Sequence, residues 1–228
     1  MKIFSNTGKG LRKTNEDYIK SEILSDSVLL HIVADGMGGY EYGEVASKTA
    51  TEAIFQYLAG CTIQGDIPAL IQQAVEFANS QILTLRNQYH TKLGTTIAGV
   101  LIIDSTAYAF WLGDVQIQHF RASKQLFISE SHTLINEMKK NGPVSTKEIE
   151  RYNHIVTKSL SGTPLEASIP IIEIQLQQGD TICISSDGLY NSVNTESLIT
   201  NSDIEINAKL MLLEDKNEDN FSIVKMII

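Results

Sequence analysis

The sequence predicts an α+β fold in which two mostly antiparallel sheets lie face to face between helices, an αββα sandwich. Strand-like segments come first, two helical segments follow, and strands then return, with little of the alternation typical of parallel βαβ units. Both sets of strands are heavily apolar, so each sheet is expected to be buried on both faces. No internal repeat or low-complexity linker divides the 228 residues, and we expect a single domain over residues 1–228.

The first half of the chain predicts one buried strand and two helices. Residues 28–34 are short, apolar and rich in branched side chains, and they lead into a glycine-rich turn at residues 35–39. Residues 41–58 repeat small and apolar side chains at intervals of three and four, which is typical of a helix with one buried face. A second helix is expected over residues 68–87, with Asp66 as its N-terminal cap.

The second half of the chain returns to strands, which are expected at residues 95–103, 107–112 and 115–120. The first two flank Asp104-Ser105, a natural hairpin turn, and the third follows closely enough to extend a meander. Residues 131–153 are polar and interrupted by Gly142-Pro143, which indicates a surface excursion with one or two short helices. The remaining strands are expected at residues 171–176, 181–185 and 221–228.

The composition excludes several classes of function. A net charge of −9 makes the phosphate backbone of a nucleic acid an unfavourable partner. Cys61 and Cys183 cannot form a disulfide framework, and the five histidines lack the spacing of zinc ligands. The N-terminus lacks the features of a secretory signal and no apolar stretch approaches membrane-spanning length, so we expect a cytoplasmic protein with no membrane partner. A monomeric state is a separate expectation.

Acidic residues stand at the ends of three apolar runs. Asp35-Gly36 and Asp187-Gly188 each end such a run, and Asp219-Asn220 opens another. A strand that ends in aspartate presents a carboxylate at the rim of a sheet, where Mg²⁺ or Mn²⁺ finds the oxygen ligands it prefers. Each pair on its own is equally typical of an ordinary turn, so the prediction of a metal site depends on the three occurring together.

A fourth polar segment precedes the first predicted strand. Arg12 stands four and five residues ahead of Glu16 and Asp17. A guanidinium can bind a phosphate with two hydrogen bonds, whereas the two acids suit a cation or the waters bound to it. Taken alone, this segment is more typical of a solvated charged turn.

Taken in order, these motifs resemble those of the metal-dependent protein phosphatases, the PPM or type 2C serine/threonine phosphatases, and the bacterial members most closely. The resemblance runs from about Gly8 to Ile228. It rests on the ordered series Arg-x-x-Asn-Glu-Asp (12–17), Asp-Gly-Met-Gly-Gly (35–39), Gly-Thr-Thr (94–96), Gly-Asp (113–114), Ser-Asp-Gly-Leu (186–189) and Asp-Asn (219–220).

The resemblance implies that water, activated by two Mn²⁺ or Mg²⁺ ions, hydrolyses phosphoserine and phosphothreonine in a protein substrate. Asp35 would bridge the two ions, Gly36 would offer its carbonyl to one of them, and Arg12 would hold the phosphate. Asp187 and Asp219 would bind the other ion, Glu16 and Asp17 would hold metal-bound waters or complete the metal shell, and Asp114 would help to hold a third, weaker ion.

Two departures from the family pattern keep an alternative open. The family commonly continues Ser-Arg after Gly-Asp, where this chain has Val115-Gln116. The segment at residues 188–218 is also short compared with that of the family, which suggests that a peripheral helix is trimmed or lost. The alternative is a pseudophosphatase or regulatory binding module of the same fold. Within the enzyme class, the chain could also serve a signalling switch with a separate Ser/Thr kinase. Residues 131–158 correspond to the flap of the family, which lies beside the active site.

Overall fold

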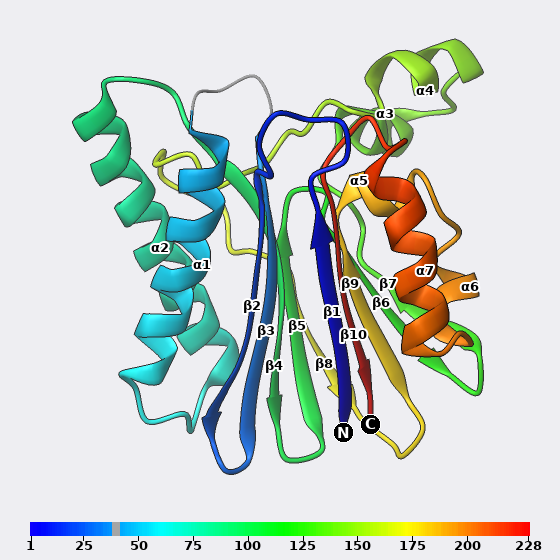
Figure 1. Cartoon of the computed structure of the whole chain (residues 1–228). Coiled ribbons are helices and arrows are strands. Elements are labelled where there is room, and N and C mark those ends of the chain that lie inside the picture. Colours follow the sequence, from blue (N-terminus) through cyan, green and yellow to red (C-terminus); the bar gives the residue numbers. More distant parts are fainter. Residues whose placement is uncertain (38–41) are drawn as a thin grey trace.

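The computed structural model describes residues 1–37 and 42–228, in which two five-stranded sheets lie face to face between helices (Figure 1). The first sheet has the order β1 (Lys2–Gly8), β10 (Phe221–Ile227), β9 (Thr181–Ser185), β6 (Gln116–Arg121), β7 (Lys124–Ile128). The second has the order β2 (Asp17–Ser25), β3 (Val28–Gly36), β4 (Thr95–Ile103), β5 (Thr106–Leu112), β8 (Ile171–Gln175). All neighbouring strands are antiparallel, so the predicted αββα sandwich is confirmed.

Helices form the two outer layers (Figure 1). The second sheet is covered by α1 (Gly43–Ala59) and α2 (Ile67–Tyr89), and the first by α5 (Asp187–Tyr190), α6 (Glu196–Ile199) and α7 (Asp203–Glu214). The polar excursion predicted at residues 131–153 contains two short helices, α3 (Leu134–Asn141) and α4 (Thr146–Tyr152). Asp66 caps α2 as predicted, because its side chain accepts a hydrogen bond from the amide of Ala69 at 3.0 Å. None of the described helices is both long and apolar enough to cross a membrane.

Three apolar clusters hold the layers together. One lies between α1, α2 and the second sheet, one between the two sheets, and one between the first sheet and the C-terminal helices. The cluster between the sheets takes side chains from both, including Val33, Val100, Ile117, Ile184 and Val224, all fully buried. Full burial of such a side chain contributes about 1.5–3 kcal/mol. Together with the two outer clusters, this layer explains why the inner strands are apolar on both faces.

Several strands and helices were not predicted from the sequence. β1 and β2 are edge strands with mostly polar, exposed or half-buried side chains, so they lack the apolar signal of the inner strands. The strand predicted as the first is therefore β3. The helices at residues 187–214 were also not predicted. Gly38 and Gly39 of the predicted turn, and Glu41 at the start of the predicted helix, lie outside the described residues.

The third strand of the predicted meander exists, but the prediction that it pairs with the second strand is wrong. β6 pairs with β7 and β9 of the first sheet, whereas β5 pairs with β4 and β8 of the second. The chain changes sheets at Gly113, which has a φ of 110° and packs so closely against Thr96 that a side chain would collide with it. Only glycine fits this left-handed, crowded position, and the turn brings Asp114 to the edge between the sheets.

Candidate metal centre

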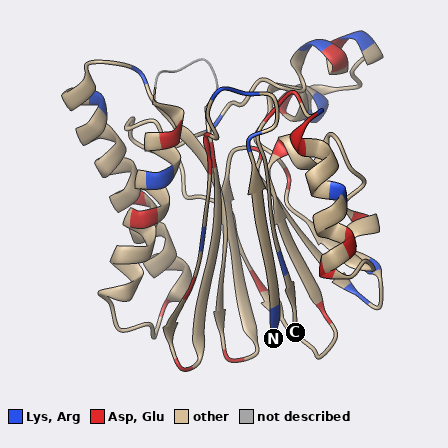
Figure 2. Cartoon of the chain, in the orientation of Figure 1, with Lys and Arg blue, Asp and Glu red and all other residues tan. Residues whose placement is uncertain are grey.

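The acidic residues singled out in the sequence meet at one end of the sandwich because their strands run antiparallel. β2 begins at Asp17 and its partner β3 ends just after Asp35, so both lie at the same edge. β9 ends just before Asp187, and its partner β10 begins just after Asp219. Asp114 follows β5 at this end. Figure 2 shows acidic positions gathered here, where α5 begins, in addition to charges elsewhere on the chain.

A cleft of about 460 Å³ opens at this end. Its lining residues are Arg12, Glu16, Asp35, Gly36, Met37, Thr96, Asp114, His154, Val156, Asp187 and Asp219. The cleft thus contains every predicted site residue except Asp17, which is buried and stands opposite Asp35 in the pairing of β2 with β3.

Neighbouring segments fix the backbone of Asp35 and Gly36. The hydroxyl of Thr95 donates to the carbonyl of Asp35 at 2.7 Å, and the amide of Gly36 donates to the carbonyl of Glu16 at 3.0 Å. A side chain at Gly36 would overlap the carbonyl oxygen of Gly43. Asp35 is therefore held in place by Thr95 of the Gly-Thr-Thr motif, which lies on β4, and by the contacts of the neighbouring Gly36 on β3.

Two asparagines hold the loop that carries Asp219. The side-chain amide of Asn217 donates to the carbonyls of Gly188 and Asp219 at 3.1 and 2.9 Å. The side-chain oxygen of Asn220 accepts from the amide of Glu16 at 2.8 Å. Both asparagines are buried. Asn220 belongs to the Asp-Asn motif singled out in the sequence, whereas Asn217 belongs to no motif that would indicate its role.

Burial and mutual repulsion make these carboxyl groups hard to ionise together. Burial, with the charge of Asp187 adding to it, raises the pKa of Asp17 and that of Asp114 to about 7. Burial and the charges of Asp17, Asp187, Asp114 and Asp219 raise the pKa of Asp35 well above its usual range. The pKa of Glu16 is raised as well, chiefly by burial. A bound cation would reverse this balance by favouring the ionised forms.

Asp17 has a buried oxygen without a partner. Its Oδ2 atom accepts a hydrogen bond from the hydroxyl of Ser186 at 2.7 Å, which links the two sheets. Its Oδ1 atom has no hydrogen-bond partner among the described residues. Buried polar atoms in folded proteins are nearly always satisfied, so this oxygen fits contact with a cation or with one of its waters.

The donors in the cleft fit hydrated Mg²⁺ or Mn²⁺ better than zinc. Across residues 1–37 and 42–228, no three or more Asp, Glu, His or Cys side chains are grouped closely enough to hold a metal ion by themselves. Structural zinc sites need such a set. Mg²⁺ keeps several waters and needs only one or two carboxylates, and Mn²⁺ takes the same oxygen ligands. Separate carboxylates around an open cleft, with excess negative charge, meet that requirement.

His132 connects residues 131–153, the polar excursion, to the turn that carries Asp114. Its amide donates to the carbonyl of Gly113 at 2.8 Å, and the amide of Gly113 donates to its Nδ1 atom at 3.0 Å. Nδ1 is therefore the unprotonated ring nitrogen. The hydroxyl of Tyr190 donates to the carbonyl of Asp114 at 3.0 Å. No histidine was predicted to take part in the site, because a side chain that contacts the backbone of a distant turn leaves no sequence motif.

Replacing His132 is expected to loosen the Asp114 turn. His132→Leu removes the acceptor for the Gly113 amide, so the Mn²⁺ concentration needed for half-maximal activity should rise several-fold. His132→Asn should stay near wild type, because its side-chain oxygen can occupy about the position of Nδ1. A Mn²⁺ titration of phosphatase activity, with thermal melting in Mn²⁺ as a second readout, checks this. Equal behaviour of the two variants would contradict it.

The fold and the oxygen-rich cleft together define the class of metal-dependent protein phosphatases, and comparisons with known proteins agree. The family model described as protein phosphatase 2C matches residues 9–217. Protein phosphatase PhpP of Streptococcus pneumoniae serotype 2 is 28% identical over 214 residues, which cover 90% of this chain and 87% of that protein. The chain belongs to the protein phosphatase 2C family, and it is a serine/threonine protein phosphatase.

Solved structures extend the comparison to the fold. A serine/threonine phosphatase of S. agalactiae is 25% identical, with a TM-score of 0.88 and coverage of 100% of this chain and 99% of that one. The catalytic domain of the serine/threonine phosphatase PstP, in complex with two manganese ions, is 24% identical, with a TM-score of 0.80 and coverage of 98% and 96%. The second likeness supports the αββα fold of this chain.

Proposed function

We propose that the cleft hydrolyses phosphoserine and phosphothreonine in protein substrates with the help of two bound Mn²⁺ or Mg²⁺ ions. The observation that carries the proposal is the convergence of Asp35, Asp114, Asp187 and Asp219 on one cleft, with raised pKa values at the first three. The two manganese ions bound to PstP, a protein of the same fold, support the number and kind of ion.

Each acidic residue has a proposed part. Asp35 would contact both ions and the carbonyl of Gly36 one of them, with Asp187 and Asp219 as further ligands. Glu16 and Asp17 would act through bound waters, and Asp114 would help hold a third, weaker ion. When bound, the ions lower the pKa of a water molecule and offset the charge of the phosphate. This chain supplies the ligands and holds them in position before substrate arrives.

Arg12 is proposed to bind the phosphate. Its Nε atom donates to the carbonyl of Glu218 at 3.0 Å, and one terminal nitrogen lies 3.0 Å from the Asp219 carboxylate. These contacts fix the guanidinium at the cleft and use two of its five N–H groups, so the others can bind phosphate oxygens.

The alternative, a pseudophosphatase or regulatory binding module, rests on the Val115-Gln116 departure. Val115 is fully buried between the sheets, and Gln116 begins β6 opposite Ser185. Both residues therefore fit the fold without disturbing the Asp114 turn, which supports the enzyme. A single domain, a monomeric state, a cytoplasmic location and a separate Ser/Thr kinase as counterpart belong to the same proposal.

Arg12→Ala tests the phosphate contact. Loss of charge-assisted hydrogen bonds of about 1.5–3 kcal/mol should lower kcat/KM for a phosphothreonine peptide about ten- to a hundredfold, mainly through KM. Arg12→Lys should keep part of the activity, because an ammonium binds phosphate as a point charge. The measurement is steady-state kinetics in saturating Mn²⁺.

The matched control is Lys13→Ala, which removes an exposed positive charge next to Arg12. If Lys13→Ala and Arg12→Ala behaved alike, Arg12 would act only through the general field of the loop. If the wild-type chain bound the peptide in Mn²⁺ without turnover, the binding module would be the better account.

A further inference from the structure

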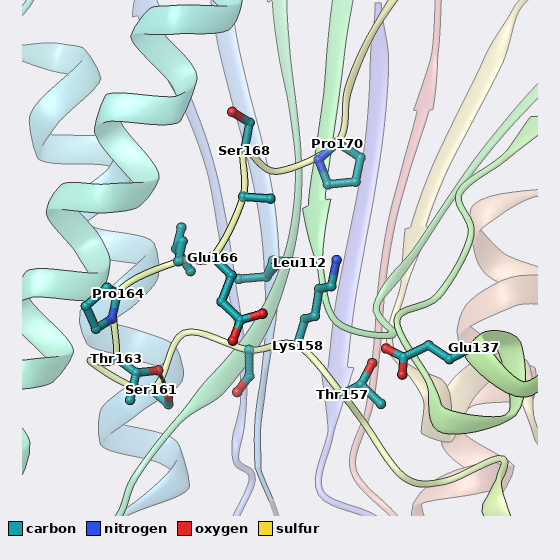
Figure 3. A pocket seen from close by; sticks show the side chains of 13 residues that line it. Leu112, Glu137, Thr157, Lys158, Ser161, Thr163, Pro164, Glu166, Ser168 and Pro170 are labelled. Atoms are coloured by element: carbon teal, nitrogen blue, oxygen red, sulfur yellow. Dashed lines mark hydrogen bonds between the residues drawn. The ribbon is translucent and has the colours of Figure 1, made fainter.

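A second cavity, of about 750 Å³, lies beside the metal cleft. Most of its wall comes from residues 157–170, and Leu112 of β5 and Glu137 of α3 complete it. Figure 3 shows Glu137 at one side, Pro164 at the other, and Lys158 and Glu166 between them. None of these residues takes part in the proposed chemistry, although the cavity exceeds the metal cleft in volume.

The cavity and the metal cleft share a wall. His154 and Val156 line the cleft, and Thr157 and Lys158 line the cavity. Val156 and Lys158 are two residues apart, at most ~7 Å along an extended chain. A bound polypeptide advances by about the same distance over two residues. A substrate whose phosphorylated residue enters the cleft can therefore reach the cavity with a residue one to three positions away.

α2 holds the wall of the cavity in a fixed shape. The side chain of Asn79 donates to the carbonyl of Thr163 at 2.6 Å and accepts from the amide of Gly162 at 2.9 Å. Gln72 accepts from the amide of Ile169 at 2.9 Å. Gly162 has a φ of 76°, and a side chain there would press on the backbone of Leu83. The cavity is thus formed in advance, which lowers the entropic cost of binding.

The lining of the cavity suits a polypeptide chain. Apolar side chains and hydroxyl groups both line the cavity. The apolar side chains are those of Leu112, Pro164, Leu165 and Pro170. The hydroxyl groups are those of Thr157, Ser159, Ser161, Thr163 and Ser168. Within the described part of the chain, the amides of residues 165–168 donate no hydrogen bond to the protein. Free amides next to an apolar surface can pair with the carbonyls of an extended peptide.

The charges in the cavity are unpaired. Glu137, Lys158 and Glu166 are all exposed, and none has an ion-pair partner within 4.0 Å among residues 1–37 and 42–228. The charged side chains of the lining are two carboxylates and one ammonium, so the lining itself is negative, while the guanidinium of Arg86, which is not part of the lining, is bound to the carbonyl of Ser161. A peptide with a positive side chain next to its phosphorylated residue would therefore match it better than one with a negative side chain.

We propose that this cavity, which we call the substrate groove, binds the polypeptide next to the phosphorylated residue and favours Lys or Arg one to three positions away. The inference rests on the proposed function, because a protein substrate must be in the cleft for its neighbouring residues to meet the groove. It adds a class of substrate, phosphoproteins with basic residues near the phosphate.

The test compares phosphothreonine peptides that carry Arg, Ala or Glu at positions −3 to +3, together with p-nitrophenyl phosphate, which has no neighbouring residues. The wild type should prefer an Arg peptide over its Glu counterpart about fivefold or more in kcat/KM. The double variant Glu137→Gln with Glu166→Gln should lose most of that preference. The control double variant, Glu150→Gln with Glu196→Gln, replaces exposed glutamates outside both cavities and should keep it.

Hydrolysis of p-nitrophenyl phosphate should be unchanged in both double variants. An unchanged peptide preference in the groove variant, or no basic preference in the wild type, would overturn the inference while leaving the proposed function intact. If Mn²⁺-dependent hydrolysis of p-nitrophenyl phosphate were absent, the proposed function would fail instead. Fluorescence anisotropy of labelled peptides, which needs no turnover, would then make the same comparison of binding.

Discussion

Asp35→Asn should lower kcat on a phosphothreonine peptide about a thousandfold or more in saturating Mn²⁺. Asparagine keeps the size and shape of the side chain but removes the charge that we propose contacts both ions. Steady-state kinetics and Mn²⁺ calorimetry check the loss of activity and of metal affinity together. The matched control is Asp26→Asn in the exposed turn between β2 and β3, which should leave both unchanged.

The same substitution should stabilise the fold when no metal is present. The pKa of Asp35 is raised by burial and by its acidic neighbours, so near pH 7 the folded state is penalised for ionising this group while the unfolded state is not. The gain should vanish below about pH 4, where the carboxyl is protonated in both states. Thermal melting in EDTA at pH 7 and pH 4 measures it. Lower stability at pH 7 would mean that the substitution itself disrupts the fold, and the kinetic result would lose its meaning.

Removal of the metal should have the second large effect. In excess EDTA, hydrolysis should fall to the background rate, and added Mn²⁺ should restore it, because no side chain of the cleft is proposed as the nucleophile. Mn²⁺ at a hundred times its dissociation constant should also stabilise the chain by about 2.7 kcal/mol, or roughly 5–10 °C in Tm. Asp35→Asn should show a smaller shift. Full activity in EDTA would contradict the account.

The inner strands of the two sheets could be predicted from the sequence, whereas of the edge strands only β8 was predicted and β1, β2 and β7 were not. The strands β3, β4 and β9 are buried on both faces, so their apolar runs identify them, and Asp66 marks the start of α2. β1 and β2 are edge strands with polar faces and carry no such signal. The change of sheet at Gly113 depends on its left-handed backbone and its contact with Thr96, which spacing does not reveal.

The sequence indicated which residues to consider for the candidate site, but it did not indicate which contacts bring them together. Asp35, Asp187 and Asp219 could be chosen because each stands at the end of an apolar run, but their common edge follows from the antiparallel pairing of the strands. The bond from Ser186 to Asp17 and that from Gly113 to His132 join residues distant in sequence. Such contacts become visible only when the two sheets are placed face to face.

The central claim is that carboxylates from separate sheet edges hold two divalent ions in one cleft. Crystals of the wild-type chain soaked in Mn²⁺, with anomalous diffraction recorded near the manganese edge, test it most directly. The account predicts two strong peaks in the cleft, with Asp35 touching both ions and Asp187 and Asp219 touching at least one. A single peak elsewhere, or no peak within reach of Asp35 at millimolar Mn²⁺, would contradict it.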